Sequence, residues 1–213
     1  MDSDDLKSAA AKSMEGSGDI RERVRELTLT AIRERKFDFA GMKDVMHQVS
    51  DGITIGAERR GEDLKQALGD AYKGMDEAFS KSAQATQLAL SELVSKGREF
   101  NDSEVRATLE AMRKLEKDLL ATLAGSAERT GGRIKEEMQE LAAHAARAGT
   151  DTGAVIAKTM SDFSHQFART AGEATQAGVE AAKALSERLA EATSGFLAGL
   201  SDALASKDKT TKH

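Results

Sequence analysis

The 213-residue chain contains no cysteine, no proline and no tryptophan, and its aromatic residues are seven phenylalanines and one tyrosine. Without cysteine, the chain has no disulfide bond, no thiolate nucleophile and no cysteine-ligated metal. A mixed or all-β fold of this length normally uses proline in its turns and aromatic residues in its core. The scarcity of both, beside abundant alanine, leucine, glutamate and lysine, favours helix.

The charge of the chain is mildly acidic and well mixed, because 31 Lys and Arg residues stand against 36 Asp and Glu residues, giving a formal net charge of −5. No basic block forms a phosphate-binding footprint, so we expect no nucleic-acid partner. The N-terminus, MDSDDLK, lacks the basic start and apolar core of a signal peptide, and no apolar run reaches the roughly 20 residues of a membrane span. We therefore expect a soluble cytoplasmic protein with no transmembrane segment.

Helix start and stop signals predict the organisation of the chain. Small polar residues over 1–18 predict a flexible lead, and KDKTTKH at 207–213 predicts a polar tail. Between them we expect one elongated helical domain, 19–206, with helices over about 19–36, 38–50, 53–100, 102–148 and 151–206. The weak points at 50–56, 101–103 and 149–151 are either hairpins or kinks. Long stretches of similar length joined by short breaks suggest antiparallel neighbours.

Apolar residues recur every eleven positions, in three series that pass through Ile20, Val24 and Phe39. Of their 51 positions, 37 are apolar, against 39% hydrophobic residues in the whole chain, and only Arg35 and Glu116 are charged. Eleven residues in three turns is 3.67 residues per turn, so the resulting apolar stripe stays almost straight or wraps gently right-handed. The pattern predicts an all-α fold of long amphipathic helices with an 11-residue apolar period, folded as an elongated antiparallel helical bundle or coiled coil.

The kernel AER-x-G occurs at Ala57–Gly61 and again at Ala127–Gly131. Of its small residues, Ala57, Gly61 and Ala127 stand on the apolar series and Gly131 is one position beyond it, and a GxxxG pair, Gly52 and Gly56, precedes the first copy. GxxxG marks close helix approach in membrane spans, whereas chance is the alternative in a chain with 18 glycines. We interpret the kernel as a place where two helices approach closely, with Arg and Glu pointing away. Gly61→Leu should then disturb assembly more than Gly61→Ala.

The sequence offers a packing surface rather than a chemical site. No nucleophile–base pair, histidine pair or Glu-x-x-His motif occurs, so we expect no catalytic residue, no metal site, no cofactor and no enzyme activity. GITIGAERRG lacks the GK[ST] of a phosphate-binding loop. The residues expected to form the helix-packing or interaction surface are Gly52, Ile53, Gly56, Ala57, Gly61, Leu64, Leu68, Ala127, Gly131, Ile134, Phe163 and Phe167.

Parts of the sequence resemble known kinds of helical protein. ATQAGVEAAKALSERLAEATSGF at residues 174–196 resembles the 11-residue repeats of phasin- and apolipoprotein-type proteins, whose helices coat storage granules or lipid droplets, and of late-embryogenesis proteins, which are disordered until dried or bound. IRERVRELTLTAIRERKFD and GITIGAERRGEDLKQAL resemble an uncharacterised bacterial family of all-helical proteins. That family implies no activity and no site residues.

Two functions therefore stand as hypotheses. The first is a non-catalytic structural or interaction protein that self-associates as a homo-oligomer through its narrow apolar stripe. The alternative is a phasin-like amphipathic coat on lipid or polyhydroxyalkanoate granule surfaces. The narrow apolar face, the lack of tryptophan and the lack of interfacial basic enrichment argue against the coat.

Overall fold

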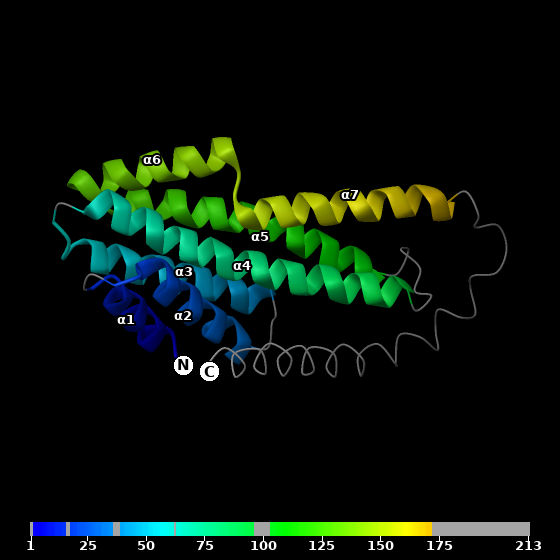
Figure 1. The fold of residues 1–213 in the computed structure, drawn as a ribbon, viewed down its shortest axis with the longest axis horizontal. Helices are drawn as coiled ribbons and strands as arrows, with labels where there is room; N and C mark the ends of the chain where they lie inside the picture. Colours follow the sequence, from blue (N-terminus) through cyan, green and yellow to red (C-terminus); the bar gives the residue numbers. More distant parts are fainter. Residues whose placement is uncertain (1, 16–17, 36–38, 62, 96–102, 172–213) are drawn as a thin grey trace. The chain divides into compact units, whose positions relative to one another are not determined.

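The computed structural model describes residues 2–15, 18–35, 39–61, 63–95 and 103–171 (Figure 1). Every regular element in these ranges is an α-helix, and the helices pack against one another, which confirms the predicted all-α bundle. The helices are α1 (Ser3–Ser13), α2 (Ile20–Glu34), α3 (Phe39–Ala57), α4 (Leu64–Ser95), α5 (Ser103–Arg129), α6 (Gly132–Ala148) and α7 (Asp151–Ala171).

The helices form two compact units. The first contains Met1–Gln84 and Leu109–Ala157, and the second contains Ala85–Thr108 and the described residues from Lys158 onward. Within the first unit, α1 and α2 lie on one side of α4, and α5 and α6 lie on the other (Figure 1). Helix α3 lies at the centre of this unit, where nine of its residues are buried.

The eleven-residue series supplies the core, because nine of the twelve largest fully buried side chains among the described residues stand on it. These nine are Val24, Met42, Met46, Ile53, Leu68, Met75, Phe79, Met112 and Met138. Full burial of such a side chain stabilises a fold by about 1.5–3 kcal/mol. The stripe of the first unit is thus covered by the chain's own helices.

The N-terminal region differs from its prediction as a flexible lead over 1–18. Residues 3–13 form α1, whose first turn is capped by Asp2, since its Oδ1 accepts a hydrogen bond from the Asp5 amide at 2.8 Å. Leu6 and Ala10 of α1 are fully buried. Alanine has the highest helix propensity but carries little hydrophobic surface, so an alanine-rich docking face looks weakly periodic in the sequence.

The predicted break at 50–56 is wrong, because α3 continues to Ala57 and α4 begins at Leu64 rather than at 53. Packing of α3 against α1 outweighs the low helix propensity of its glycines and β-branched residues. The predicted helix over 102–148 is also divided, since α5 ends at Arg129 and α6 begins at Gly132, which has a φ of 55°.

The predicted break at 149–151 is confirmed. Gly149 ends α6 with φ 82° and ψ 174°, a conformation that is essentially restricted to glycine. The chain continues into α7 in the same direction, so this break is not a hairpin (Figure 1). At the predicted break of 101–103, α5 begins at Ser103. Residues 96–102 and 172–213, which include the predicted tail, lie outside the described residues.

Two helical hairpins, α3–α4 and α5–α6, carry the two AER-x-G kernels at their turns. Side-chain bonds between these hairpins join residues at an almost constant separation. Ser50 bonds Ser126 across 76 positions, Asp51 bonds Arg129 across 78, and Lys65 bonds Glu140 across 75. A constant separation means that the hairpins lie side by side in parallel. It is also close to seven eleven-residue periods, about 77 residues, so the stripe keeps its phase from one hairpin to the next.

Candidate functional site

A close helix contact in the first unit joins α1 to α3 through the predicted GxxxG pair. A Cβ atom on Gly52 would lie 2.5 Å from the Cβ of Ala10 and still closer to the carbonyl oxygen of Lys7. A Cβ atom on Gly56 would lie 2.5 Å from the Cβ of Met14. Real Cβ atoms essentially never approach so closely. The two glycines therefore allow the backbones of α1 and α3 to touch, and this contact lies within one chain.

Two arginines hold the C-terminal end of α1. Arg23 of α2 donates from Nε and Nη2 to the carbonyl oxygen of Ser13, at 3.1 and 2.9 Å, and from Nη2 to the carbonyl oxygen of Glu15 at 3.0 Å. Arg60 donates from Nε to the carbonyl oxygen of Met14 at 2.7 Å. The last carbonyls of a helix lack partners within the helix and carry partial negative charge, so guanidinium groups satisfy them well.

The repeated kernel occupies helix ends rather than a packing face. Ala57 and Ala127 are buried at the ends of α3 and α5, whereas Gly61 and Gly131 are exposed in the following turns. No heavy atom lies within 4 Å of a Cβ built on either glycine. The prediction that these two glycines stand at a close contact is therefore wrong for the chain's own helices.

The arginine of each kernel makes an ion pair instead of pointing away. Arg59 donates to Glu15 at 2.7 Å, which ties the first turn to the end of α1. Arg129 donates to Asp51 at 2.8 Å and to Ser126 Oγ at 3.0 Å, which ties α5 to α3. The kernel thus joins neighbouring helices through its charged residues.

The other predicted packing residues have several environments. Ile53, Leu64 and Leu68 are buried in the first unit, Phe163 is buried in the second, and Ile134 of α6 is only partly buried. The side chain of Phe167 lies outside the described part of α7. These residues are buried by their own chain, which does not test whether they also contact a second copy, so their role in self-association stays a prediction.

A buried group of hydroxyls joins α3, α4 and α5. Ser50 Oγ lies 2.7 Å from both Tyr72 OH and Ser126 Oγ, and all three residues are buried. Burial raises the pKa of Tyr72 to about 12, although hydrogen bonds from the neighbouring hydroxyls oppose this shift. Each bond contributes about 1 kcal/mol and fixes how the three helices pair.

A carboxylate on α4 caps the start of α7. Asp76 is buried, and its Oδ2 and Oδ1 accept hydrogen bonds from the amides of Asp151 and Thr152 at 2.8 and 3.0 Å. Thr152 Oγ1 returns a bond to the carbonyl oxygen of Asp76 at 3.0 Å. Lys73 pairs with Asp151 at 2.7 Å. An anion at a helix N-terminus is favoured both by the free amides and by the helix dipole.

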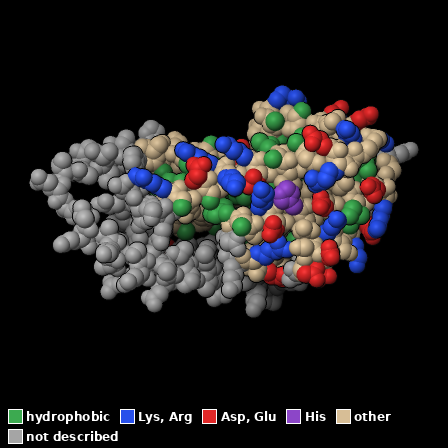
Figure 2. Space-filling view, turned by 180° about the vertical axis from the view of Figure 1, so that it is seen from behind, with side chains coloured by type: hydrophobic (Ala, Val, Ile, Leu, Met, Phe, Trp, Pro, Cys, Tyr) green, Lys and Arg blue, Asp and Glu red, His purple; other side chains and the backbone are tan. Residues whose placement is uncertain are grey.

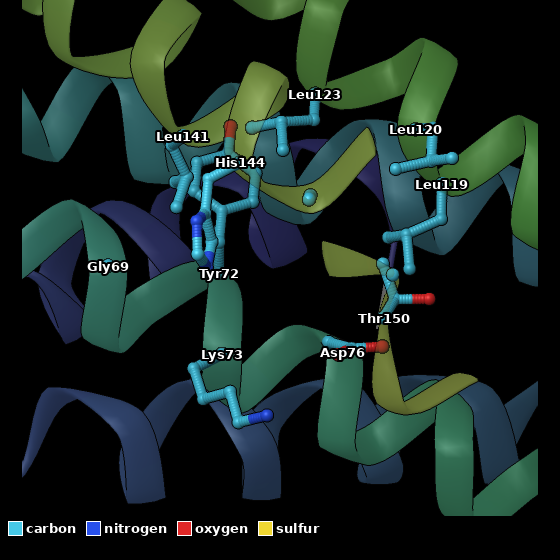
Figure 3. A pocket seen from close by; sticks show the side chains of 12 residues that line it. Gly69, Tyr72, Lys73, Asp76, Leu119, Leu120, Leu123, Leu141, His144 and Thr150 are labelled. Carbon is cyan, nitrogen blue, oxygen red and sulfur yellow. The ribbon is translucent and has the colours of Figure 1, made fainter. Parts of the chain in front are cut away.

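Beside Asp76, a cavity of about 170 Å³ opens between α4, α5 and α6 (Figure 3). Its walls are mainly apolar. Residues of α4 form one side, leucines of α5 form another, and α6 with the turn before α7 closes it (Figure 3). The lining residues are Gly69, Tyr72, Lys73, Asp76, Leu119, Leu120, Leu123, Leu141, His144, Ala145, Gly149 and Thr150. We call this cavity the inner cleft.

A second, larger groove of about 480 Å³ lies between α4 and α6 and shares Gly69, Leu141 and His144 with the inner cleft. We call it the outer groove. Lys65 pairs with Glu140 at 2.6 Å along this outer groove, and the bond lowers the pKa of Glu140 and raises that of Lys65. Helix α6 has one fully buried residue, Met138, which explains why the groove beside it stays open.

A family model described as a family of unknown function, DUF6781, matches residues 1–206. The chain belongs to this family. The expectation of an uncharacterised family is thereby confirmed, and a bacterial origin stays a prediction. No curated protein matches the chain, and no solved structure does.

For this DUF6781 member, the described residues contain no group of three His, Asp or Glu side chains placed to hold a metal ion. Among the same residues, no helix is long and apolar enough to cross a membrane. Acidic and basic side chains alternate over the face seen in Figure 2, without a large patch of one sign. The features that the structure offers are therefore helix contacts, the inner cleft and the outer groove.

The polar residues of these features were missed by the sequence reasoning. One signal was present, because Ser50 stands two eleven-residue steps before Tyr72, and a polar residue on an apolar stripe needs a buried partner. Arg60 and Asp76 gave no comparable signal, since their partners are main-chain groups of helices distant in the sequence.

Proposed function

We propose that this protein is a non-catalytic structural or interaction protein that works by helix–helix packing in the cytoplasm and that it self-associates. The observation that carries the proposal is the backbone contact of α1 with α3 at Gly52 and Gly56. Buried and half-buried charged groups support it, because Arg23, Arg60 and Asp76 bond main-chain atoms of neighbouring helices. Side chains bonded in this way serve assembly rather than acid–base chemistry.

The route of self-association follows from where the predicted interaction residues lie. Gly52, Ile53 and Gly56 already face α1 or the core of their own chain. Two copies can use the same residues only by exchanging a helix, as in domain swapping. We expect α1 to be the exchanged helix, because its docking surface contains the GxxxG pair.

The test is the mass of the full-length protein in plain buffer, measured by light scattering after size-exclusion chromatography. A defined dimer or larger oligomer that becomes monomeric when Gly52 and Gly56 are both changed to alanine supports the proposal. A wild-type protein that stays monomeric over a wide concentration range overturns self-association. An oligomer that the double variant leaves intact overturns the exchange of α1.

The phasin-like coat on lipid or polyhydroxyalkanoate granules is the second candidate, favoured by the eleven-residue period of the sequence. A coat should gain much helicity when vesicles or granules are added, since its apolar faces would otherwise contact water. Circular dichroism with and without vesicles of neutral and anionic phospholipid separates the two candidates. Full helicity and cooperative melting without lipid, unchanged by its addition, would rule out the coat.

A further inference from the structure

Gly69 in the interior of α4 has no close neighbour that would require a glycine. Gly52, Gly56 and Gly74 each face the backbone or Cβ of another helix, whereas no heavy atom lies within 4 Å of a Cβ on Gly69. A glycine inside a helix destabilises it by about 0.5–1 kcal/mol relative to alanine. Gly69 lines both the inner cleft and the outer groove. The missing side chain therefore keeps the passage between these two spaces open.

The inner cleft has the size and lining of a site for a small apolar group. Its volume of about 170 Å³ compares with an engineered cavity of roughly 150 Å³ that takes up benzene. Leu119, Leu123 and Leu141 supply apolar walls, and Tyr72 adds an aromatic ring (Figure 3). The hydroxyl of Tyr72 already bonds Ser50, so the ring is held in place.

Two acidic and two basic side chains line the outer groove, so its formal charges balance and an anion would have to bind at the cation that has no acidic partner. Lys65 is neutralised by Glu137 and Glu140, at 3.6 and 2.6 Å. Arg147 lines the same groove and has no acidic partner among the described residues, and His144 lies where groove and cleft meet. A guanidinium group binds a carboxylate through two parallel hydrogen bonds, and an imidazole N–H can add a third.

We propose that the inner cleft and the outer groove together bind a small amphipathic carboxylate. Its aryl or alkyl group would lie among the leucines of α5 and Leu141. Its chain would pass Gly69, and its carboxylate would reach Arg147 and His144. This inference goes beyond the proposed structural function and does not depend on self-association.

The test uses 4-phenylbutyrate as the probe and the full-length chain, with binding followed by isothermal titration calorimetry and by ligand-observed NMR. Gly69→Leu should weaken binding by at least about tenfold, because the added side chain fills the passage. The matched control is Gly61→Leu, which adds the same side chain in open space and lines neither the cleft nor the groove. Both variants should keep the wild-type circular dichroism spectrum, since neither new Cβ meets a neighbour.

The carboxylate contact is tested separately. Arg147→Gln should weaken phenylbutyrate binding by about tenfold, the scale of a lost charge-assisted hydrogen bond, whereas Lys135→Gln on the same helix should not. 4-Phenylbutanol, which lacks the charge, should bind the wild type about as weakly as phenylbutyrate binds Arg147→Gln. No saturable binding of phenylbutyrate up to about 1 mM, or equal binding by Gly69→Leu, overturns the site. Equal binding of the acid and the alcohol overturns the assignment of a carboxylate.

Discussion

Two helix contacts in the first unit use glycine in opposite ways. Between α1 and α3, Gly52 and Gly56 let two backbones touch, and a side chain at either position would collide with the neighbouring helix. Between α4 and α6, Gly69 faces open space. The first contact is sealed by arginines that cap α1, whereas the second leaves a groove. The same residue type therefore closes one interface and opens another, and the neighbour in space decides which.

The largest expected effect breaks the closed contact. Changing Gly52 and Gly56 together to alanine should destabilise the protein by roughly 3 kcal/mol or more, even though alanine favours helix, because α1 must move away from α3. The measurement is the urea midpoint by circular dichroism, with amide hydrogen exchange of α1. A stability equal to or above that of the wild type would show that α1 does not dock on these glycines.

The next effect concerns Tyr72 of α4, whose hydroxyl bonds Ser50 of α3 and whose ring lines the inner cleft. Because burial raises the pKa of Tyr72 to about 12, the folded state keeps the phenolic proton after the unfolded state has lost it. Stability should be unaffected below about pH 10 and then fall by about 1.4 kcal/mol per pH unit up to about pH 12.

Urea unfolding at about pH 9 and pH 11 measures this loss, and Tyr72→Phe serves as the control that should not show it. Tyrosinate absorbance reports on Tyr72 alone, since the chain has one tyrosine and no tryptophan. A tyrosinate signal that rises near pH 10 in the folded protein would contradict the buried hydroxyl cluster.

A smaller effect is expected at the arginine cap of the closed contact. Arg60→Met keeps much of the aliphatic side chain but leaves the Met14 carbonyl without its donor, so we expect a loss of about 1.5 kcal/mol. Arg59→Met is the matched control, because Arg59 pairs with an exposed carboxylate, and such pairs contribute at most about 1 kcal/mol. Thermal or urea unfolding measures the free energy of unfolding of the two variants. Equal losses would show that the Arg60 bond to the Met14 carbonyl contributes no more than an exposed ion pair.

The smallest effect has the opposite sign and lies in the open contact. Gly69→Ala should stabilise the protein by about 0.5–1 kcal/mol, since the new methyl group meets no neighbour and alanine lowers the entropy of the unfolded chain. Urea unfolding measures the gain. A loss of stability would mean that the groove closes in solution and that the two contacts do not differ.

The eleven-residue hydrophobic period correctly predicted which residues are buried between the helices. Residues such as Val24, Met46 and Phe79 are buried because an eleven-residue stripe can only be covered by other helices. Helix ends were predicted only where local signals were strong, as at Gly149. The end of α3 was misplaced because the glycines that suggested a break are stabilised by α1, and α1 itself was not predicted.

The candidate sites could not be predicted from the sequence, for a physical reason. Gly52, Gly61 and Gly69 look alike along the chain, yet one touches a backbone, one lies in a turn and one borders a cavity. Their roles depend on residues that come near only after folding. Asp76 likewise becomes a helix cap only when α7 begins beside it.

The near-constant separation between bonded residues of the two hairpins also bears on how the chain folds. Ser50 with Ser126, and Asp51 with Arg129, join residues 76 and 78 positions apart. No bond of this set can form until the residues of the second hairpin have been made. The entropic cost of closing a loop depends on the logarithm of its length. Because these bonds close loops of nearly equal length, each has a similar entropic cost, and they can form together. We therefore expect the docking of the two hairpins to be one cooperative, late step.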